Sequence, residues 1–386
     1  MNPATIDKIN RMIEAAERWL EAHDYHHIEC NYVPPRLFTR HRKLNMLIRT
    51  VFRLLPFNLR SKKDIAQSPY TPHEAVASLA ACGAGGDAAT GTRLTRRVLE
   101  QLRSPLTGNF ALRQGIRISI SLYEDSADDP TPLNTVFFGN YLLDHAPADD
   151  ATRREVLVSI CRYLTQELGY EDYGTEGVYF FYGHHLKDVI YNASAIISSF
   201  LIRTGTALNL DEYVELGRRG IRFIINNQNP DGSWYYCAPP HRKAIDGFHQ
   251  SYILKALIDV RDDAVDGLAE CITKGAEFYR SQFTETGAYL IPQRYDKRFN
   301  PGNTWLFQRL DGRDLSEAIS FYSMYLPDEE RVEKLVNYMH DRVFSPRSGK
   351  LAPEIFVYGK NHNEYIEFYA WYLHALYCAR NTFAAK

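Results

Sequence analysis

Helical spacing of apolar residues dominates the chain, and the pattern repeats. In residues 219–234, an apolar helical face is followed by a Pro-Asp-Gly turn and then by an aromatic side chain. Residues 274–289 repeat this order with Gly287 in the turn before Tyr289, and their Gly275 corresponds to Gly220 of the first copy. Two copies of so specific a pattern indicate a repeated helical unit.

Weaker copies extend this repeat over the whole chain. The anchor residues, spaced by 80, 64, 60, 55 and 60 positions, are Trp19, Leu99, Tyr163, Phe223, Phe278 and Tyr338. Each copy is followed by a stretch that is apolar on nearly all sides, as in a helix packed inside a ring. These inner stretches begin at His73, Asn134, Tyr191, Phe248, Asp314 and Tyr365. Six pairs of charged outer and apolar inner helices predict an all-α fold, an (α/α)6 toroid, with residues 1–386 as a single domain.

The first spacing contains a basic insertion at residues 39–63. Leu44, Leu47, Ile48 and Val51 recur there at helical steps, which predicts an amphipathic helix. The insertion has no acidic residue, and its eight basic residues are Arg40, Arg42, Lys43, Arg49, Arg53, Arg60, Lys62 and Lys63. Such a helix suits an anionic membrane surface or an acidic polymer. The alternative is an ordinary helix that packs its apolar side on the ring and leaves its basic side in solvent.

The composition of the chain limits the classes of partner and the cellular compartment that we expect. A net charge of −2 gives no general attraction to nucleic acid, so no nucleic-acid partner is expected. The first 25 residues mix charged and apolar side chains, unlike a secretory signal or a membrane span. Six cysteines stand singly, which is typical of buried free thiols in a reducing compartment. We therefore expect a cytoplasmic protein, and the basic insertion leaves peripheral attachment to the inner membrane open.

Candidate chemistry lies where the inner helices begin, because loops from outer to inner helices open on the same end of a toroid. Asp246 and His249 stand three residues apart at such a start, and this pair could move a proton to a sugar oxygen or from C5 of a uronate. The structural alternative is that Asp246 caps the helix and His249 satisfies it. Asp311 and Arg313 start another inner helix, where an Arg beside carboxylates would suit a carboxylated sugar.

The following residues, Asp314 and Glu317, have the spacing of a capping pair, which is a sufficient structural explanation for them. Glu364 and Tyr191 also stand at inner-helix starts and complete the predicted catalytic set with Asp246, His249 and Asp311. Aromatic faces in these loops can stack on sugar rings while polar groups bond the hydroxyls. The predicted substrate-binding residues are Trp234, Tyr235, Arg313, Asn192, His185 and Tyr182.

The sequence contains no clear motif for binding a metal or a cofactor. His184, His185 and Asp188 lack the spacing of zinc ligands, and no second Cys or His cluster accompanies them. The sequence has no Gly-rich phosphate loop after a strand and no Gly-x-Ser-x-Gly elbow. We expect neither a metal nor a cofactor.

Two family resemblances bear on the interpretation. Residues 219–234 resemble the glutamine–tryptophan repeat of squalene and oxidosqualene cyclases, which implies an α-toroid. The acidic Asp-x-Asp-Asp motif of those cyclases is absent, and the nearest sequence, residues 123–129, has a different spacing. Polyprene cyclisation is therefore not implied.

Residues 178–380 resemble the toroid polysaccharide biosynthesis proteins encoded in bacterial exopolysaccharide gene clusters. The stretches that carry this resemblance are Tyr191-Asn192-Ala-Ser-Ala, Gln228-Asn-Pro-Asp-Gly-Ser-Trp-Tyr-Tyr236, Asp246-Gly-Phe-His-Gln-Ser-Tyr252 and Trp371-Tyr-Leu-His-Ala-Leu376. Where that family shows Tyr-Pro-x-Asp-x-His, this chain has Arg309-Leu-Asp311-Gly-Arg-Asp314, so only Asp311 or Asp314 could be carried over. The resemblance implies a role in producing surface polysaccharide.

These observations predict a carbohydrate-active enzyme, either a glycoside hydrolase or a uronate lyase or epimerase, that acts on an oligo- or polysaccharide. A lipid-linked substrate stays open, as does peripheral contact with an anionic membrane or a synthesis complex. One alternative is a non-catalytic glycan-binding or scaffold subunit of such a complex. The other is an isoprenoid-lipid enzyme of the terpenoid-cyclase type.

Two geometric expectations follow from the repeat. The first is that one rim of the ring gathers Asp246, His249, Asp311, Tyr191 and Glu364. The second is that Trp234 and Tyr289 occupy equivalent places just beyond two successive outer helices.

Overall fold

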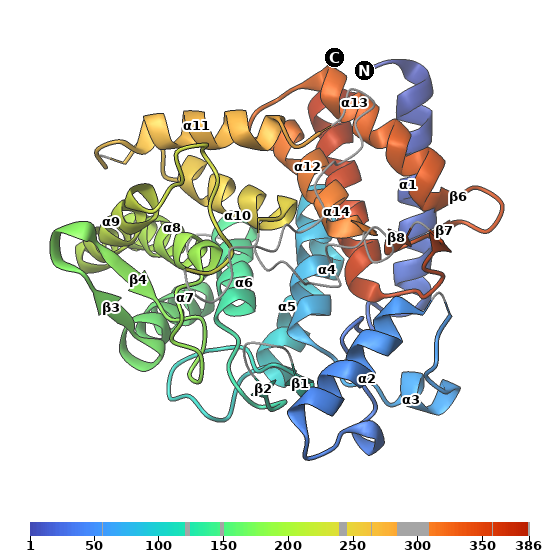
Figure 1. Cartoon of the computed structure of the whole chain (residues 1–386), viewed down its shortest axis with the longest axis horizontal. Helices are drawn as coiled ribbons and strands as arrows, with labels where there is room; N and C mark the ends of the chain where they lie inside the picture. The colour runs from blue at the N-terminus through green and yellow to red at the C-terminus, as the bar shows by residue number, and fades with distance from the viewer. Residues whose placement is uncertain are drawn as a thin grey trace.

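The computed structural model describes residues 1–55, 57–119, 124–146, 150–238, 245–263, 265–283, 309–356 and 358–384. Six inner helices form a ring, in which each packs on the next and the last packs on the first (Figure 1). They are α4 (Pro72–Gly85), α6 (Pro132–His145), α8 (Tyr191–Leu208), α10 (Gly247–Ile258), α12 (Gly312–Met324) and α14 (Ile366–Phe383). Each begins within two residues of its predicted start.

Six outer helices surround this ring. They are α1 (Pro3–Ala22), α5 (Ala88–Gln101), α7 (Ala151–Arg162), α9 (Asp211–Asn226), α11 (Leu268–Arg280) and α13 (Glu329–Tyr338). Each of α5, α7, α9, α11 and α13 packs on the inner helix that precedes it in the chain, and α1 packs on α14. The predicted (α/α)6 toroid is therefore confirmed.

Glycines allow the closest approach of inner and outer helices. A Cβ atom at Gly217 of α9 would lie 2.6 Å from the Ser198 carbonyl oxygen of α8. At Gly275 of α11, a Cβ atom would lie 3.0 Å from the ring of Trp234. Gly275 belongs to the repeated pattern, and its equivalent Gly220 likewise faces the Ser198 side chain of α8, so the glycines of the pattern lie where an outer helix meets its neighbours.

Trp234 packs within the protein interior, just beyond α9. Its side chain is buried, and its indole N–H donates to the Ile224 carbonyl over 3.0 Å. The backbone amide of Trp234 donates to the side chain of Gln250. Its ring therefore joins α9, α10 and α11. The predicted equivalent, Tyr289, lies outside the described residues.

The two ends of the chain meet at one seam of the ring. Trp19 of α1 stacks on Tyr369 of α14, with ring centroids 4.0 Å apart. Lys8 donates to Asn337 over 2.7 Å, which ties α1 to α13. The ring is therefore closed by contacts between residues more than 300 positions apart in the sequence.

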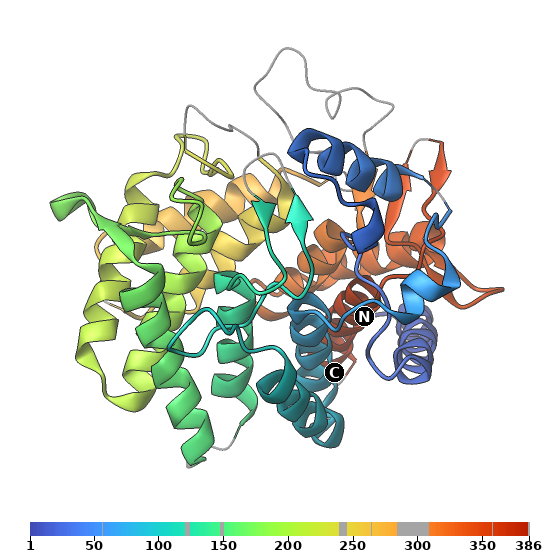
Figure 2. The same cartoon turned by 90° about the horizontal axis from the view of Figure 1, so that it is seen from below.

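The rim carries short antiparallel strands and two further helices. Three sheets have two strands each, and they are β1 (Ile118–Ser119) with β2 (Glu124–Asp125), β3 (Tyr170–Asp172) with β4 (Val178–Phe180), and β6 (Phe344–Ser345) with β7 (Lys350–Leu351). A fourth sheet has three strands in the order β5 (Arg309–Asp311), β8 (Glu354–Phe356), β9 (Gly359–Lys360). The helices are α2 (Arg42–Leu54) and α3 (Lys62–Ala66). Figure 2 shows α2, the β1–β2 pair and the strands after α13 on one end of the ring.

The six cysteines are buried thiols outside any disulfide in the described structure, as predicted. No helix in the described part of the chain is both long and apolar enough to cross a membrane.

Candidate functional site

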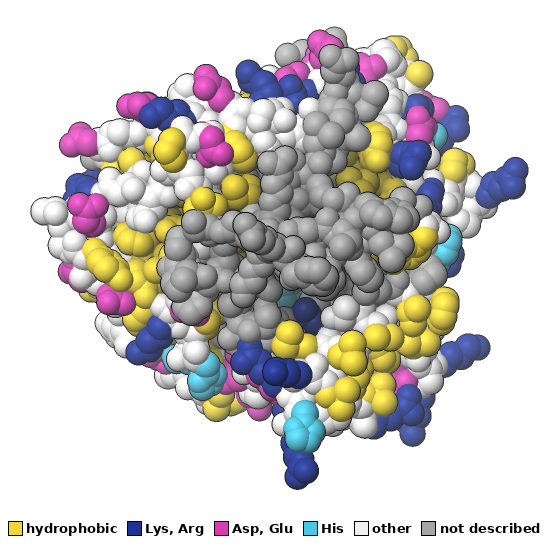
Figure 3. Space-filling model, in the orientation of Figure 1, with side chains coloured by type: hydrophobic (Ala, Val, Ile, Leu, Met, Phe, Trp, Pro, Cys, Tyr) yellow, Lys and Arg dark blue, Asp and Glu magenta, His cyan; other side chains and the backbone are white. Residues whose placement is uncertain are grey.

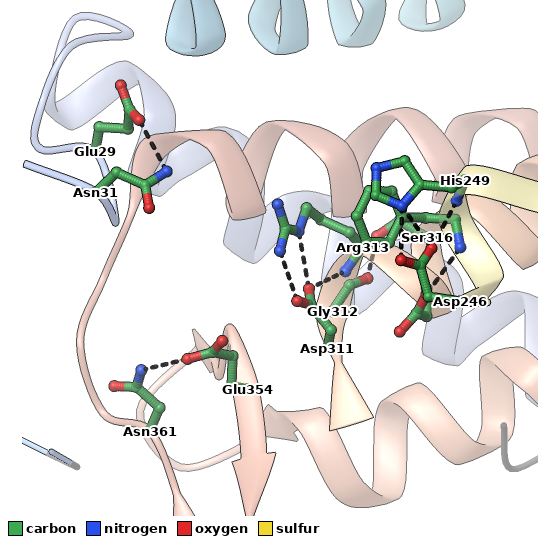
Figure 4. Close-up of polar contacts among 12 residues, drawn as sticks. Glu29, Asn31, Asp246, His249, Asp311, Gly312, Arg313, Ser316, Glu354 and Asn361 are labelled. Atoms are coloured by element: carbon green, nitrogen blue, oxygen red, sulfur yellow. Dashed lines mark hydrogen bonds and ion pairs between the residues drawn. The ribbon is translucent and has the colours of Figure 1, made fainter. Parts of the chain in front are cut away.

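The start of α10 holds a carboxylate–imidazole pair. Asp246 is the N-cap residue, and its carboxylate accepts the backbone N–H of His249 over 3.0 Å. The Nδ1 atom of His249 also lies 2.7 and 2.6 Å from the two carboxylate oxygens (Figure 4). Asp246 is buried, so this contact is shielded from solvent. The cap and the side-chain pair are thus present together.

This geometry fixes the orientation of the imidazole. Because Nδ1 faces an acceptor, it carries the hydrogen, and Nε2 is left on the side of the ring that faces away from Asp246. The ring is also held by Phe248 and Tyr236, whose centroids lie 4.0 and 4.5 Å away. His249 is therefore held in place with Nε2 directed away from its partner.

The start of α12 is organised around an ion pair. Asp311 caps the helix and accepts the backbone N–H of Arg313 over 3.1 Å. The guanidinium of Arg313 makes two further bonds to the same carboxylate, of 3.0 and 2.7 Å. It also lies over the Phe248 ring, 4.8 Å from the centroid. Arg313, predicted to bind a carboxylated sugar, thus bonds a carboxylate of its own chain.

The predicted capping pair of Asp314 and Glu317 is wrong. The helix begins one turn earlier in the chain than that pattern requires, with Asp311 as its cap. Asp314 instead accepts the backbone N–H of Phe248 over 2.9 Å, and Glu317 pairs with Lys255. Both side chains therefore join α12 to α10.

Asp314 is a candidate proton donor. Burial raises its pKa well above the usual range, and the carboxylates of Asp311 and Asp246 add to the effect. A neutral carboxylic acid can give up a proton that an ionised neighbour cannot. The starts of α10 and α12 therefore place three carboxyl groups and an imidazole close together.

A second acidic group lies nearby, and the predicted catalytic set did not include it. Glu367 begins α14, and Glu29 lies in the loop after α1. Burial raises the pKa of each to about 7, and Glu29 further raises the pKa of Glu367. His73, at the start of α4, has its Nδ1 atom 3.7 Å from the Glu29 carboxylate. Arg313 is one of the charges that acts on Glu367, which connects this group to the α12 start.

The other predicted site residues have different surroundings. Glu364 bonds Lys350 over 2.6 Å and accepts from the Tyr369 hydroxyl. Tyr191 donates its hydroxyl to Asn227 over 3.2 Å. Their hydrogen bonds thus join them to residues other than Asp246 and Asp311. The structure brings Asp246, His249 and Asp311 together and gives Glu364 and Tyr191 other partners.

The remaining predicted substrate-binding residues differ in their surroundings. Asn192 is buried, and its side-chain oxygen has no hydrogen-bond partner among the described residues. His185 lies 3.8 Å from Asp129 and is exposed. Tyr182 packs against a small apolar cluster, whereas Tyr235 is half-buried against the main core. Trp234, which was also predicted to contact substrate, is fully buried.

Solved structures with this fold include several enzymes that act on sugars. A sugar epimerase from a ruminal bacterium has a TM-score of 0.58 at 11% identity, covering 81% of this chain and 88% of its own. A family 76 glycoside hydrolase (mannosidase) from Bacteroides thetaiotaomicron has a TM-score of 0.56 at 11% identity, with 98% of both chains covered. A polysaccharide lyase has a TM-score of 0.55 at 10% identity, again with 98% of both chains covered. No protein-family model and no curated protein matches the sequence. At these identities the similarity shows a shared toroid fold.

Proposed function

We propose that this protein is a carbohydrate-active enzyme that transfers protons at the starts of α10 and α12. The observation that carries the proposal is the contact between Asp246 and Nδ1 of His249, which leaves Nε2 directed away from the carboxylate. A neutral imidazole held in this way can accept a proton through Nε2, and Asp246 stabilises the imidazolium that forms. The shared fold with an epimerase, a mannosidase and a lyase supports a sugar substrate.

The same residues can serve two reaction types. In elimination or epimerisation of a uronate, Nε2 of His249 takes the proton from C5, and an acid such as Asp314 protonates the departing oxygen or the opposite face. In glycoside hydrolysis, the acid protonates the glycosidic oxygen while a base activates water. Asp314 and Glu367 are the groups whose raised pKa suits the acid role.

We further propose that the substrate is an oligo- or polysaccharide of a bacterial surface, as the resemblance of residues 178–380 implies. A lipid-linked form of this glycan and peripheral contact with the inner membrane are part of the proposal. A scaffold or glycan-binding role would use the same rim without proton transfer, and the experiment below separates the two.

The test is an activity screen on soluble polyuronates and neutral glycans. A lyase raises ultraviolet absorbance through an unsaturated uronide, a hydrolase releases reducing ends, and an epimerase exchanges the C5 hydrogen with solvent deuterium. We expect His249→Gln to lower the rate by about 10²- to 10⁴-fold, the usual contribution of a general base. Asp246→Asn should also lower it while keeping the helix cap, because Asn caps as well as Asp.

His340→Gln is the matched control, because His340 lies after α13 and contacts Asp341 instead of the site. Its activity should equal that of the wild type. Glycan binding without any product, or full activity of His249→Gln, would contradict the proposed mechanism.

A further inference from the structure

Helix α2 has one side fixed to the rim. Asn45 is buried, and its side chain bonds the backbone N–H and carbonyl of Thr39. Phe52, two turns later, is also buried and lies under the guanidinium of Arg60. These contacts use the Asn45–Phe52 side of the helix, and Leu44, Leu47 and Val51 lie on the side next to it.

This neighbouring side of α2 is apolar and exposed. Leu44, Leu47 and Val51 follow one another at steps of three and four, and their exposed fractions are 42%, 58% and 40%. The apolar side chains of Phe57 and Leu59, just past the end of α2, are exposed as well. We call these five side chains the apolar stripe. It holds half of the ten large hydrophobic side chains that are exposed in the described residues, so it is a patch and not scattered exposure.

Basic side chains border the apolar stripe. Arg40, Arg42 and Lys43 are exposed where α2 begins, and Lys62 and Lys63 are exposed just after the stripe. Figure 3 shows hydrophobic side chains gathered over α2 with Lys and Arg around them. Arg60 does not take part, because it is buried and donates to the carbonyls of Tyr32 and Cys30.

We propose that α2 and the turn after it bind the surface of an anionic lipid bilayer. The apolar stripe enters the region between headgroups and acyl chains, and the flanking Arg and Lys side chains contact lipid phosphates. An acidic polysaccharide or a nucleic acid would match the charges but would leave five large apolar side chains in water. Only a partner that is both apolar and anionic matches the whole surface.

Membrane binding through α2 rests on the proposed function, because it concerns where the glycan substrate meets the enzyme. Helix α2 lies on the end of the ring that carries the rim strands (Figure 2). A protein seated through α2 therefore turns this end toward the bilayer. The glycan that reaches it would be one held near the membrane surface.

Co-sedimentation with vesicles tests the proposal. The full chain should bind vesicles of equal parts phosphatidylglycerol and phosphatidylcholine, bind pure phosphatidylcholine weakly, and lose affinity as salt rises. Leu47→Glu should weaken binding by about tenfold or more, since burial of a leucine contributes at least that factor. Lys43→Glu should weaken it by about tenfold, because the charge reverses near an anionic surface.

Two variants serve as matched controls. Leu106→Glu places the same change at a leucine that is 61% exposed elsewhere, and Arg96→Glu reverses an exposed charge on α5. Both should bind vesicles like the wild type. All of the substituted side chains are exposed, and melting curves check that each variant is folded.

Several outcomes would overturn the proposal. They are absence of binding to anionic vesicles, equal binding to neutral ones, or equal loss in variants and controls. A dimer that Leu47→Glu converts to a monomer, without any change in vesicle binding, would identify a second copy as the occupant. Activity on soluble glycans is measured separately, so failure of His249 chemistry and failure of lipid binding are distinguishable.

Discussion

At the scale of single residues, the protonation of Glu367 connects stability to pH. Burial, with a smaller effect from Glu29, raises the pKa of Glu367 from 4.5 to about 7. Between these two pH values the folded protein keeps a proton that the unfolded chain has released. The free energy of unfolding therefore falls as the pH rises through this window, by about 1.4 kcal/mol for each unit of pKa difference.

We expect Glu367→Gln to remove this contribution. Its stability, measured by urea unfolding at several pH values, should fall less between pH 4.5 and pH 7 than that of the wild type. The exposed Glu100→Gln variant should keep the wild-type slope. An unchanged slope in Glu367→Gln would show that this carboxyl is ionised in the folded protein throughout the window.

Residue-level prediction from the sequence succeeded where a residue has a local role. Asp246 and His249 are three apart on one helix, so their contact follows from helical geometry. Glu29 lies in an irregular loop and meets His73 and Glu367 only because the ring closes. The spacing of residues in the sequence does not predict contacts of this kind. Glu364 and Glu367 stand near the same helix start, so spacing could not show which of them belongs to the site.

At the scale of helices and strands, glycine spacing sets how closely α8 and α9 pack. An alanine at Gly217 would place its Cβ atom 2.6 Å from the backbone oxygen of Ser198, which cannot move without shifting α8. Alanine normally favours a helix by about 1 kcal/mol over glycine. Here the overlap should outweigh that preference.

We therefore expect Gly217→Ala to lower the free energy of unfolding by about 1 to 3 kcal/mol, the usual effect of overpacking. Chemical denaturation with circular dichroism measures it. Gly183→Ala is the control, because no atom lies within 4 Å of the added Cβ. A stabilised Gly217→Ala protein would mean that the helices can separate at little cost.

The helices were predictable because a period of 3.6 residues is visible over several turns. The strands were not, because β1, β2, β6, β7 and β9 have two residues each and cannot show alternation. The sequence also could not predict that the apolar stripe on α2 is exposed. An amphipathic pattern predicts an apolar and a polar face of a helix. Which side of α2 is covered by the protein is shown only by the structure, in which Asn45 is buried.

At the scale of the whole molecule, closure of the ring should make its parts unfold together. The seam joins α1 to α13 and α14, and α14 packs on α4. We expect the slowest backbone amides of α8 and α14 to exchange with the same free energy, because both then report global unfolding. Hydrogen exchange with mass spectrometry measures this. Markedly faster exchange throughout α14 would show that the seam opens while the rest of the ring stays folded.

Arg60 connects helix α2 to the acidic site around Glu367. Its guanidinium lies between the rings of Phe52 on α2 and Tyr365, the residue before α14. It also bonds the Cys30 carbonyl, and the side chain of Cys30 acts to lower the pKa of Glu367. We therefore expect a ligand that displaces α2 to change the surroundings of Glu367. Thermodynamic linkage then requires reciprocity: whatever factor a bilayer adds to glycan affinity, the glycan must add to bilayer affinity.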